Sequence, residues 1–208
     1  YRQGLEKLVD FYTRTGNSMK LNWARTELDA LNRAPQYRFV IQAEAAGPDL
    51  RAMTLIAGAD VLYRDGMAYY SEGRPIVGLT NEGKLRMALD RFNQLIADYP
   101  TSDKIDDAAY AAGEIYEYFG DYSIAALYYT RAFQWDDNTP HPARFKAAYV
   151  YDRHLANRQR ALELYQDYLA RDPRNMRFRR YAENRVAEIM KEPTREPQPL
   201  PPSVPPVP

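Results

Sequence analysis

The side chains that could take part in acid–base or metal chemistry are few and scattered. The chain has two histidines, His141 and His154, and no cysteine, which excludes a disulfide framework, a thiolate metal site and a cysteine nucleophile. His141 lies between two prolines in a predicted loop, where an imidazole is usually just exposed to solvent. His154 falls at the end of a predicted helix, where a cationic ring suits the helix dipole. Neither histidine is therefore assigned a catalytic or ligating role.

Two acidic pairs, Asp106-Asp107 and Asp136-Asp137, invite a different chemistry. Paired carboxylates can act as general acid and base or bind a divalent cation. Asp106-Asp107 opens a predicted helix, however, where carboxylates cap free N–H groups and favour the positive end of the dipole. No phosphate-binding loop, nucleophile elbow or His-Glu-x-x-His pattern occurs in the sequence. We therefore expect a protein that is not an enzyme, with no catalytic residues, no metal site and no cofactor.

The composition indicates an ordinary folded chain. Its 208 residues carry 28 basic and 28 acidic side chains, and 45% of them are hydrophobic. This balance argues against a polybasic nucleic-acid binder and against a disordered chain. No apolar run approaches the roughly 20 residues that a membrane-spanning helix needs, so no transmembrane segment is expected. The start at Tyr1 suggests a processed or truncated product, in which any signal peptide would have preceded this residue.

A helical repeat accounts for most of the tyrosines. Between residues 106 and 139, small and large apolar side chains recur at helical spacing on both sides of Gly120-Asp121-Tyr122. Small residues at a helix crossing let two backbones approach, while large residues fill the space beside them. These positions are occupied by Gly113, Tyr116, Ala125, Tyr129 and Ala132. The segment resembles the tetratricopeptide repeat, a 34-residue helix–turn–helix unit, and this resemblance implies an all-α, right-handed solenoid of antiparallel helix pairs.

Two further copies flank this segment. The following copy has Ala148, Tyr151, Ala161, Tyr165 and Pro173 at the family positions. The second helix of the preceding copy is marked by Ala88, Phe92, Leu95 and Pro100. Its first helix is predicted over residues 52–70, with Gly66 and Tyr69 at the small and large positions. Residues 71–82 then form a loop longer than the family's tight turn, which we expect to hold a hairpin-like excursion at 75–78.

The N-terminal region, residues 1–50, shows weaker similarity to the repeat. Two predicted helices flank Gly16-Asn17, and residues 37–46 are expected to form a connection. A degenerate repeat is one interpretation of this region. The solenoid itself is predicted over residues 51–191, with about three repeats followed by a capping helix at its end.

The C-terminal segments differ in character. The capping helix is predicted over 177–191, with Tyr181, Val186 and Ile189 on its packed side and many charges opposite. Residues 192–208 form a proline-rich tail, since eight of the 16 residues from 193 onward are proline. Proline fixes φ and removes a donor, so we expect extended polyproline II there. Such a tail serves either as a linker or as a docking segment.

In the family that the repeat segment resembles, the first helix of each repeat lines a concave groove. The family's offsets define a predicted groove that is aromatic and acidic and suits an extended or polyproline peptide. The predicted groove consists of Tyr63, Met67, Tyr70, Asp107, Tyr110, Glu114, Glu117, Tyr118, Phe145, Tyr149, Asp152 and Arg153. The alternative is that several of these tyrosines only pack against a neighbouring repeat. The lysine and asparagine cluster with which some relatives clamp a terminal carboxylate is missing, so that ligand is not expected.

Three hypotheses for function remain open. The first is a non-catalytic scaffold that binds a protein or an extended peptide in the predicted groove. The second is a self-assembling structural protein that forms head-to-tail oligomers or filaments, because residues 98–137 carry nine acids and two bases whereas residues 144–191 carry 12 bases and six acids. The third is nucleic-acid binding, and the balanced charge of the chain argues against it. It would use Arg171, Arg174, Arg177, Arg179, Arg180 and Arg185.

The run from Phe92 to Tyr122 is also similar to bacterial envelope proteins of the same superfamily, such as outer-membrane assembly lipoproteins and Tol–Pal coordinators. This resemblance implies an extracytoplasmic location, in the periplasm or at the cell surface of a bacterium, with the cytoplasm as the alternative. A lipid anchor would need a cysteine upstream of Tyr1, because the chain itself has none.

Overall fold

The fold is all-α, as predicted. The computed structural model describes residues 2–33, 40–74, 80–171 and 175–191. Within these ranges the chain forms helices, and its one β contact is an isolated bridge between Thr54 and Ser102. The helices in chain order are α1 (Arg2–Thr15), α2 (Ser18–Arg33), α3 (Gln42–Ala46), α4 (Ala57–Gly73), α5 (Glu82–Asp98), α6 (Ile105–Phe119), α7 (Tyr122–Trp135), α8 (Ala143–Arg153), α9 (Arg158–Arg171) and α10 (Met176–Lys191).

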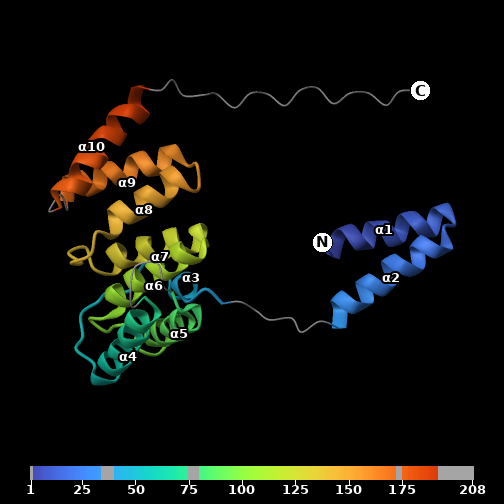
Figure 1. Cartoon of the computed structure of the whole chain (residues 1–208), viewed down its shortest axis with the longest axis horizontal. Helices are drawn as coiled ribbons and strands as arrows, with labels where there is room; N and C mark the ends of the chain where they lie inside the picture. Colours follow the sequence, from blue (N-terminus) through green and yellow to red (C-terminus); the bar gives the residue numbers. More distant parts are fainter. Residues whose placement is uncertain (1, 34–39, 75–79, 172–174, 192–208) are drawn as a thin grey trace. The chain divides into compact units, whose positions relative to one another are not determined.

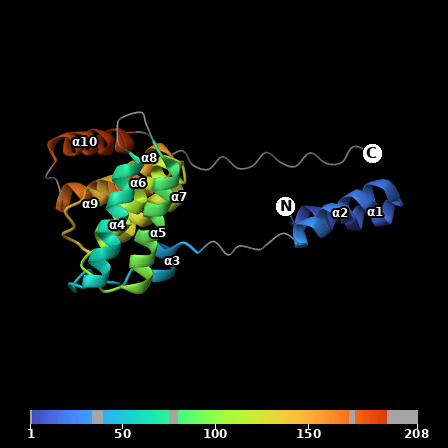
Figure 2. The ribbon, with the colours of Figure 1, turned by 60° about the horizontal axis from the view of Figure 1, so that its bottom comes forward.

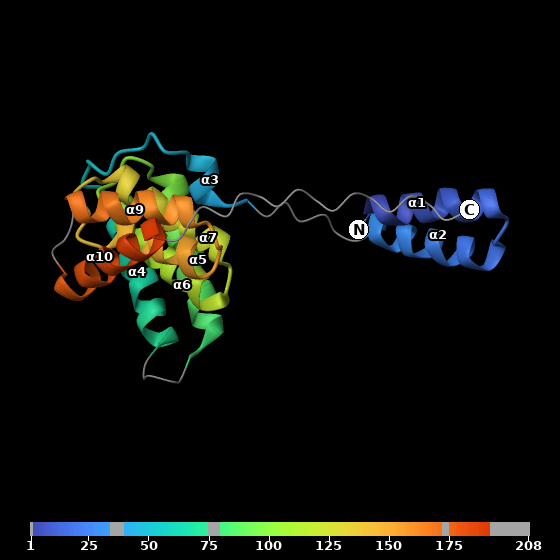
Figure 3. The same cartoon turned by 90° about the horizontal axis from the view of Figure 1, so that it is seen from above.

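Helices α1 and α2 form a hairpin within a compact unit that ends at Val40 (Figure 3). Leu5 and Ala24 are the buried apolar residues of this pair. The predicted break is present, because Gly16 adopts a left-handed φ of 68°. Asn17 then accepts a hydrogen bond from the backbone N–H of Lys20 at 3.1 Å, which caps the start of α2.

The repeats lie in a second compact unit that begins at Ile41. Helix α4 packs against α5, α6 against α7 and α8 against α9, and each pair also contacts the next (Figure 1). Helix α10 packs against α9 in the position predicted for a capping helix. Phe92, Tyr129 and Tyr165 have no exposed surface, so the large residues of the three second helices fill the core.

Two glycines show why the repeat needs small residues at the helix crossings. A Cβ added at Gly113 would lie 2.8 Å from two ring carbons of Tyr129 on the paired helix. A Cβ at Gly66 would lie 2.5 Å from a ring carbon of Phe92. Both contacts are closer than real Cβ atoms tolerate, so the small and large positions identified in the sequence face each other.

The first helix of the first repeat begins later than predicted. It was expected from residue 52, but α4 starts at Ala57. Residues 52–54 instead lie outside the helix, and their backbone N–H groups bond to the loop after α5 and to the last residue of α7. The N–H of Thr54 donates to the carbonyl of Thr101 at 2.9 Å, and the N–H of Ala52 donates to the carbonyl of Trp135 at 3.0 Å.

Part of the expected connection at 37–46 is also helical. Helix α3 packs against α5 and α7, with Ala43 fully buried (Figure 2). Arg131 on α7 donates from Nε to the carbonyl of Ala43 at 2.9 Å. The indole N–H of Trp135 donates to the carbonyl of Gly47 at 2.9 Å. These contacts join residues 41–50 to the repeats, so the second compact unit begins before the predicted boundary at 51.

Two predicted features lie outside the described residues. They are the hairpin-like excursion at 75–78 and the proline-rich tail at 192–208. The helices that the structure does describe are all too short or too polar to span a lipid bilayer.

Candidate functional site

Helices α4 and α6 bring the first predicted groove residues together. Tyr70 donates its hydroxyl proton to Oε2 of Glu114 at 3.0 Å, and Arg74 donates to the Tyr70 oxygen at 2.9 Å. Burial, followed by the negative charge of Glu114, raises the pKa of Tyr70 to about 12. Burial and the same carboxylate also raise the pKa of Tyr110. Both phenols therefore stay protonated at neutral pH and act as hydrogen-bond donors.

His141 is held against α6 and is not a freely solvated loop residue. Its ring stacks on Tyr110 with centroids 4.3 Å apart and planes inclined by 8°. Its Nε2 atom lies 2.9 Å from Oδ1 of Asp107. The imidazole and the carboxylate are 30% and 17% exposed, and the loop between α7 and α8 is thereby fastened to the start of α6. Tyr110 is covered by this contact and remains only 8% exposed.

Asp106 and Asp107 were predicted to cap the start of α6, but Asp106 is instead buried. Lys104 occupies the N-cap position, without a side-chain hydrogen bond. Asp106 is 2% exposed. Burial raises the pKa of Asp106 to about 6 and outweighs the proximity of the Thr139 hydroxyl and of the Asp107 N–H, which lowers this pKa. The charges of Asp107 and Asp136 raise it further.

Glu117 connects the second and third repeats. Its Oε2 atom accepts hydrogen bonds from the hydroxyl of Tyr129 and from Nζ of Lys146, the latter at 2.9 Å. The side chains of Lys146 and Glu117 are 23% and 20% exposed. The ammonium group also lies 5.6 Å from the centre of the Tyr129 ring. Glu117 is thus already engaged inside the molecule, although the sequence places it in the predicted groove.

An open depression of about 480 Å³ lies where α6, α8 and α10 meet. Aromatic side chains from α8 and α10 form most of its lining, and three charged side chains complete it. The lining residues are Glu117, Phe145, Lys146, Tyr149, Arg177, Phe178 and Tyr181. Phe145 stacks on Phe178 with ring centroids 4.3 Å apart, and Tyr149 lies 5.9 Å from Tyr181. Since Glu117 is paired with Lys146, Arg177 adds a positive charge at the edge of an aromatic surface.

Asp152 holds α10 against α8. Its two carboxylate oxygens accept hydrogen bonds from Arg185 at 2.6 and 2.8 Å, and its side chain is only 1% exposed. The hydroxyl of Tyr165 lies a further 3.5 Å away. This predicted groove residue is therefore part of a buried ion pair that positions the wall of the depression.

The remaining predicted groove residues are dispersed. Tyr63 and Met67 are half-buried against the core of the first repeat, and burial raises the pKa of Tyr63 to about 12 with help from nearby aspartates. Tyr118 is 43% exposed and contacts the adjacent Phe119 edge to face. Arg153 is exposed at the end of α8. Tyr118 and Tyr149 are thus the predicted tyrosines that remain most open to a ligand near the depression.

Sequence reasoning missed the contribution of α10. Phe178 was not selected, and Tyr181 was assigned only to the packed side of a cap. Both face Phe145, with Tyr181 at 5.7 Å between ring centroids. Their spacing could have indicated this contact, because aromatic residues three apart lie on one face of a helix. That helix directly follows the third repeat, which contains Phe145 and Tyr149.

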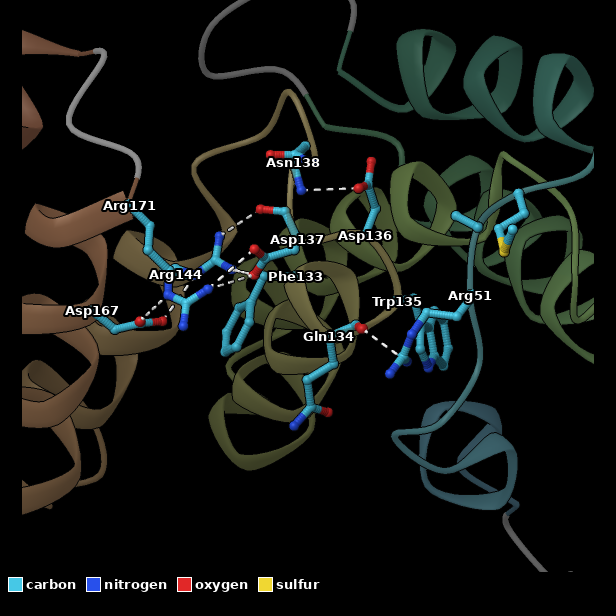
Figure 4. Close-up of a pocket in the computed structure, with 12 residues that line it drawn as sticks. Arg51, Phe133, Gln134, Trp135, Asp136, Asp137, Asn138, Arg144, Asp167 and Arg171 are labelled. Carbon is cyan, nitrogen blue, oxygen red and sulfur yellow. Dashed lines mark hydrogen bonds and ion pairs between the residues drawn. The ribbon is translucent and has the colours of Figure 1, made fainter.

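A second depression, of about 520 Å³, lies near the loop after α7 (Figure 4). Four of its six charged lining residues, Asp137, Arg144, Asp167 and Arg171, pair with one another. The guanidinium of Arg144, 2% exposed, bonds to Asp137 and to Oδ2 of Asp167, the latter at 2.9 Å. Arg171 bonds to the same two carboxylates at 3.1 and 2.7 Å. Two positive and two negative charges therefore cancel, and this network joins the second repeat to the third.

These pairs also bear on the other hypotheses. The acidic stretch 98–137 and the basic stretch 144–191 meet within one chain, because Asp137 pairs with Arg144 and Arg171. Of the arginines considered for nucleic acid, Arg171 and Arg185 are engaged with aspartates and Arg179 with a glutamate.

The comparison with protein families supports the repeat assignment. The family model described as tetratricopeptide repeat matches residues 60–102 and 142–175. The matched ranges fall on the first and third of the three helix pairs. A search among curated proteins found no match to the chain. Repeats of this family generally mediate protein–protein interaction and serve as scaffolds, and they are typically non-catalytic.

Proposed function

We propose that this chain, which carries tetratricopeptide repeats, is a non-catalytic scaffold that binds an extended protein segment across α6, α8 and α10. The observation that carries the proposal is the aromatic depression of about 480 Å³. Aromatic faces give a large contact area at low conformational cost, because their side chains have few rotatable bonds. An extended peptide presents alternate side chains and unpaired carbonyls to such a surface.

The charges of the site favour a ligand with at least one acidic residue. Glu117 and Asp152 are paired with Lys146 and Arg185, whereas Glu114 keeps its charge and is hydrogen-bonded to the neutral hydroxyl of Tyr70. The predicted acidic character is therefore reduced at the α8 and α10 end. Lys146 is balanced by Glu117, and Arg177 is the charge of the lining for which the described part of the chain supplies no ion pair. A peptide that combines apolar or proline residues with a carboxylate is therefore the best complement to this surface.

The test is an array of immobilised 15-residue peptides, which includes proline-rich sequences with and without an acidic residue, probed with the full-length protein. Replacement of Tyr149 by alanine should weaken binding to the selected peptides at least tenfold. Replacement of Tyr118 should weaken it less, because this ring is not part of the lining. Tyr69→Ala is the control, since Tyr69 lies on α4 outside the lining and packs against the core, so it reports the effect of losing a packed tyrosine alone. Equal binding by the native, Tyr149→Ala and Tyr69→Ala proteins would rule out the site.

Two broader proposals accompany this one. The first is an extracytoplasmic location in a bacterium, which rests on the resemblance to envelope proteins and is tested by fractionation of cells that express the natural gene. The second is head-to-tail self-association, which rests on the opposite charges of residues 98–137 and 144–191. This second proposal predicts an oligomer in light scattering that dissociates as the salt concentration rises. A salt-independent monomer would rule it out.

A further inference from the structure

The hairpin of α1 and α2 carries large apolar side chains that the chain leaves exposed. Phe11 on α1 is 52% exposed, and Met19 and Trp23 on α2 are 77% and 58% exposed. Single apolar residues at a surface are ordinary, but a contiguous patch of them marks an interaction site. The question is therefore whether these three side chains share one side of the hairpin.

Helical geometry places them on the same side. Leu5 and Ala24 are buried between the two helices and mark the sides that face each other. A helix turns ~100° per residue, so Phe11 lies ~120° around α1 from Leu5, with Leu8 halfway between them. Trp23 lies ~100° around α2 from Ala24 in the same sense. Because the helices run in opposite directions (Figure 3), rotations of the same sense lead to the same side. We call this surface the hairpin face, and it consists of Leu8, Phe11, Met19 and Trp23.

The charged residues lie mainly on the other side. Glu6 and Asp10 on α1 are rotated by ~100° and ~140° in the opposite sense from Leu5. Arg25 and Asp29 on α2 are rotated by the same ~100° and ~140° from Ala24. Glu27 lies toward the hairpin face but is already engaged in an interaction within the chain. The hairpin is therefore amphipathic as a unit, with aromatic rings on one side and charges of both signs on the other.

A unit of this size buries little apolar surface by itself. Among its described residues, Leu5 and Ala24 are the buried apolar ones. Units shorter than ~40 residues usually need disulfides, a metal ion or oligomerisation to be stable. The chain has no cysteine, and its described residues contain no cluster of side chains that could hold a metal ion. Association through the hairpin face is the remaining source of stability.

We propose that the hairpin face binds the same face of a second copy of the chain, so that two hairpins form a four-helix bundle. A twofold contact of this kind pairs one patch with itself and closes after two copies. It thereby differs from head-to-tail association, which joins two different surfaces. The inference is independent of the proposed function, because no residue of the aromatic depression takes part in the contact.

The size and the charge of the hairpin favour this partner. Helices of 14 and 16 residues are ~21 and ~24 Å long and each is ~10 Å wide, so the face measures ~20 by ~22 Å. Two such faces cover ~900 Å² in flat projection, and interdigitated side chains add to this area. A specific interface buries at least ~1,000 Å² in total. A lipid surface fits less well, since helices that bind it carry an excess of lysine and arginine on their polar side.

The test measures the mass of the full-length protein by light scattering over a series of concentrations. We expect a dimer that dissociates on dilution and persists at high salt, because salt does not screen apolar contacts. Trp23→Lys should weaken dimerisation at least ~30-fold, as the loss of a central aromatic residue does at other interfaces. Met190→Lys is the control and should leave the dimer intact, because Met190 is a 67% exposed apolar residue on α10, outside the hairpin.

Tryptophan fluorescence gives a second readout that needs no substitution. The chain has two tryptophans, and Trp135 is only 1% exposed, so added acrylamide quenches mainly Trp23. Formation of the dimer covers Trp23 and should therefore lower this quenching severalfold between dilute and concentrated samples.

Each other outcome counts against the proposal. A monomer at every concentration would overturn it, whether Trp23 is freely quenched or is shielded within its own chain. A dimer that survives Trp23→Lys, or that dissociates as the salt concentration rises, would place the interface elsewhere. Binding to anionic lipid vesicles without a dimer would identify a membrane surface as the partner. None of these results bears on the peptide array, so the proposed function stands or falls separately.

Discussion

The ion pair between Asp152 and Arg185 should control whether α10 stays attached to the repeats. Asp152 is 1% exposed and receives two hydrogen bonds from Arg185, whose own side chain is 17% exposed. Removing one member of a buried pair costs about 3 to 5 kcal/mol, because the other charge stays buried without a partner. Arg185 retains contact with water, so removing Arg185 should reduce the free energy of unfolding more than removing the charge of Asp152.

Arg185→Met is expected to destabilise the protein by about 3 kcal/mol, since it leaves the nearly inaccessible carboxylate of Asp152 uncompensated. Asp152→Asn should cost about 1 to 2 kcal/mol, because the guanidinium can turn toward solvent and toward Glu188, which it already contacts. The double variant should be more stable than Arg185→Met alone. The two changes are therefore expected to couple by about 1 to 2 kcal/mol.

The assay is urea unfolding followed by circular dichroism, with hydrogen exchange of the α10 amides as a local readout. Arg179→Met is the control, since Arg179 pairs with Glu183 on the exposed face of the same helix. An exposed pair of this kind contributes about 0.5 kcal/mol or less. The reasoning is refuted if Arg185→Met costs no more than Arg179→Met. It is also refuted if Asp152→Asn costs more than Arg185→Met.

Three further changes test other parts of the molecule. Gly113→Ala should lower the free energy of unfolding, measured in urea, by about 1 to 2 kcal/mol. The added methyl group would overpack against the buried Tyr129 ring, and this cost exceeds the ~1 kcal/mol gain in helix propensity. A variant as stable as the native protein would contradict this. Tyr181→Phe should leave stability unchanged or raise it by up to ~1 kcal/mol, since the buried hydroxyl of Tyr181 has no hydrogen-bond partner in the described residues. A clearly lower melting temperature in thermal unfolding would show that a partner exists. Asp106 has a raised pKa, of about 6, so its protonated form contributes stability that is present near pH 4 and lost as the pH rises through 6. Asp106→Asn should therefore stabilise the protein by up to about 2 to 3 kcal/mol at pH 7.5 relative to its effect at pH 4. An equal effect at both pH values would refute the assignment.

The repeat could be predicted because its determinants are local. Gly113 and Tyr129 stand at fixed positions along two adjacent helices, and only a small residue allows the approach that the structure shows. Gly120 adopts a left-handed φ of 83° at the predicted tight turn. The spacing within each helix also determines which residues share a face, which is why Phe145 and Tyr149 were predicted beside each other.

The prediction of the groove was less accurate than that of the repeat, because burial of its residues depends on other helices. Offsets along one helix do not specify which side chain of another helix will cover a residue. Tyr110 is covered by His141 from the loop after α7, and Asp152 is covered by Arg185 from α10. Both contacts depend on segments more than 30 residues away along the chain. The predicted start of α4 was wrong for a similar reason, because the backbone of residues 52–54 bonds to the loop after α5 and to the last residue of α7.

The sequence by itself therefore determined the class of fold, the pairing of successive helices and the residue types at the helix crossings, since these follow from helical periodicity and side-chain volume. The tertiary structure decided which of the projected side chains remain open to a ligand. It placed Phe178, Tyr181 and Arg177 of α10 beside Phe145 and Tyr149. It also paired Glu117 with Lys146 and Asp152 with Arg185. Burial and charge pairing depend on how helices are placed against one another, and no periodicity within a single helix contains that information.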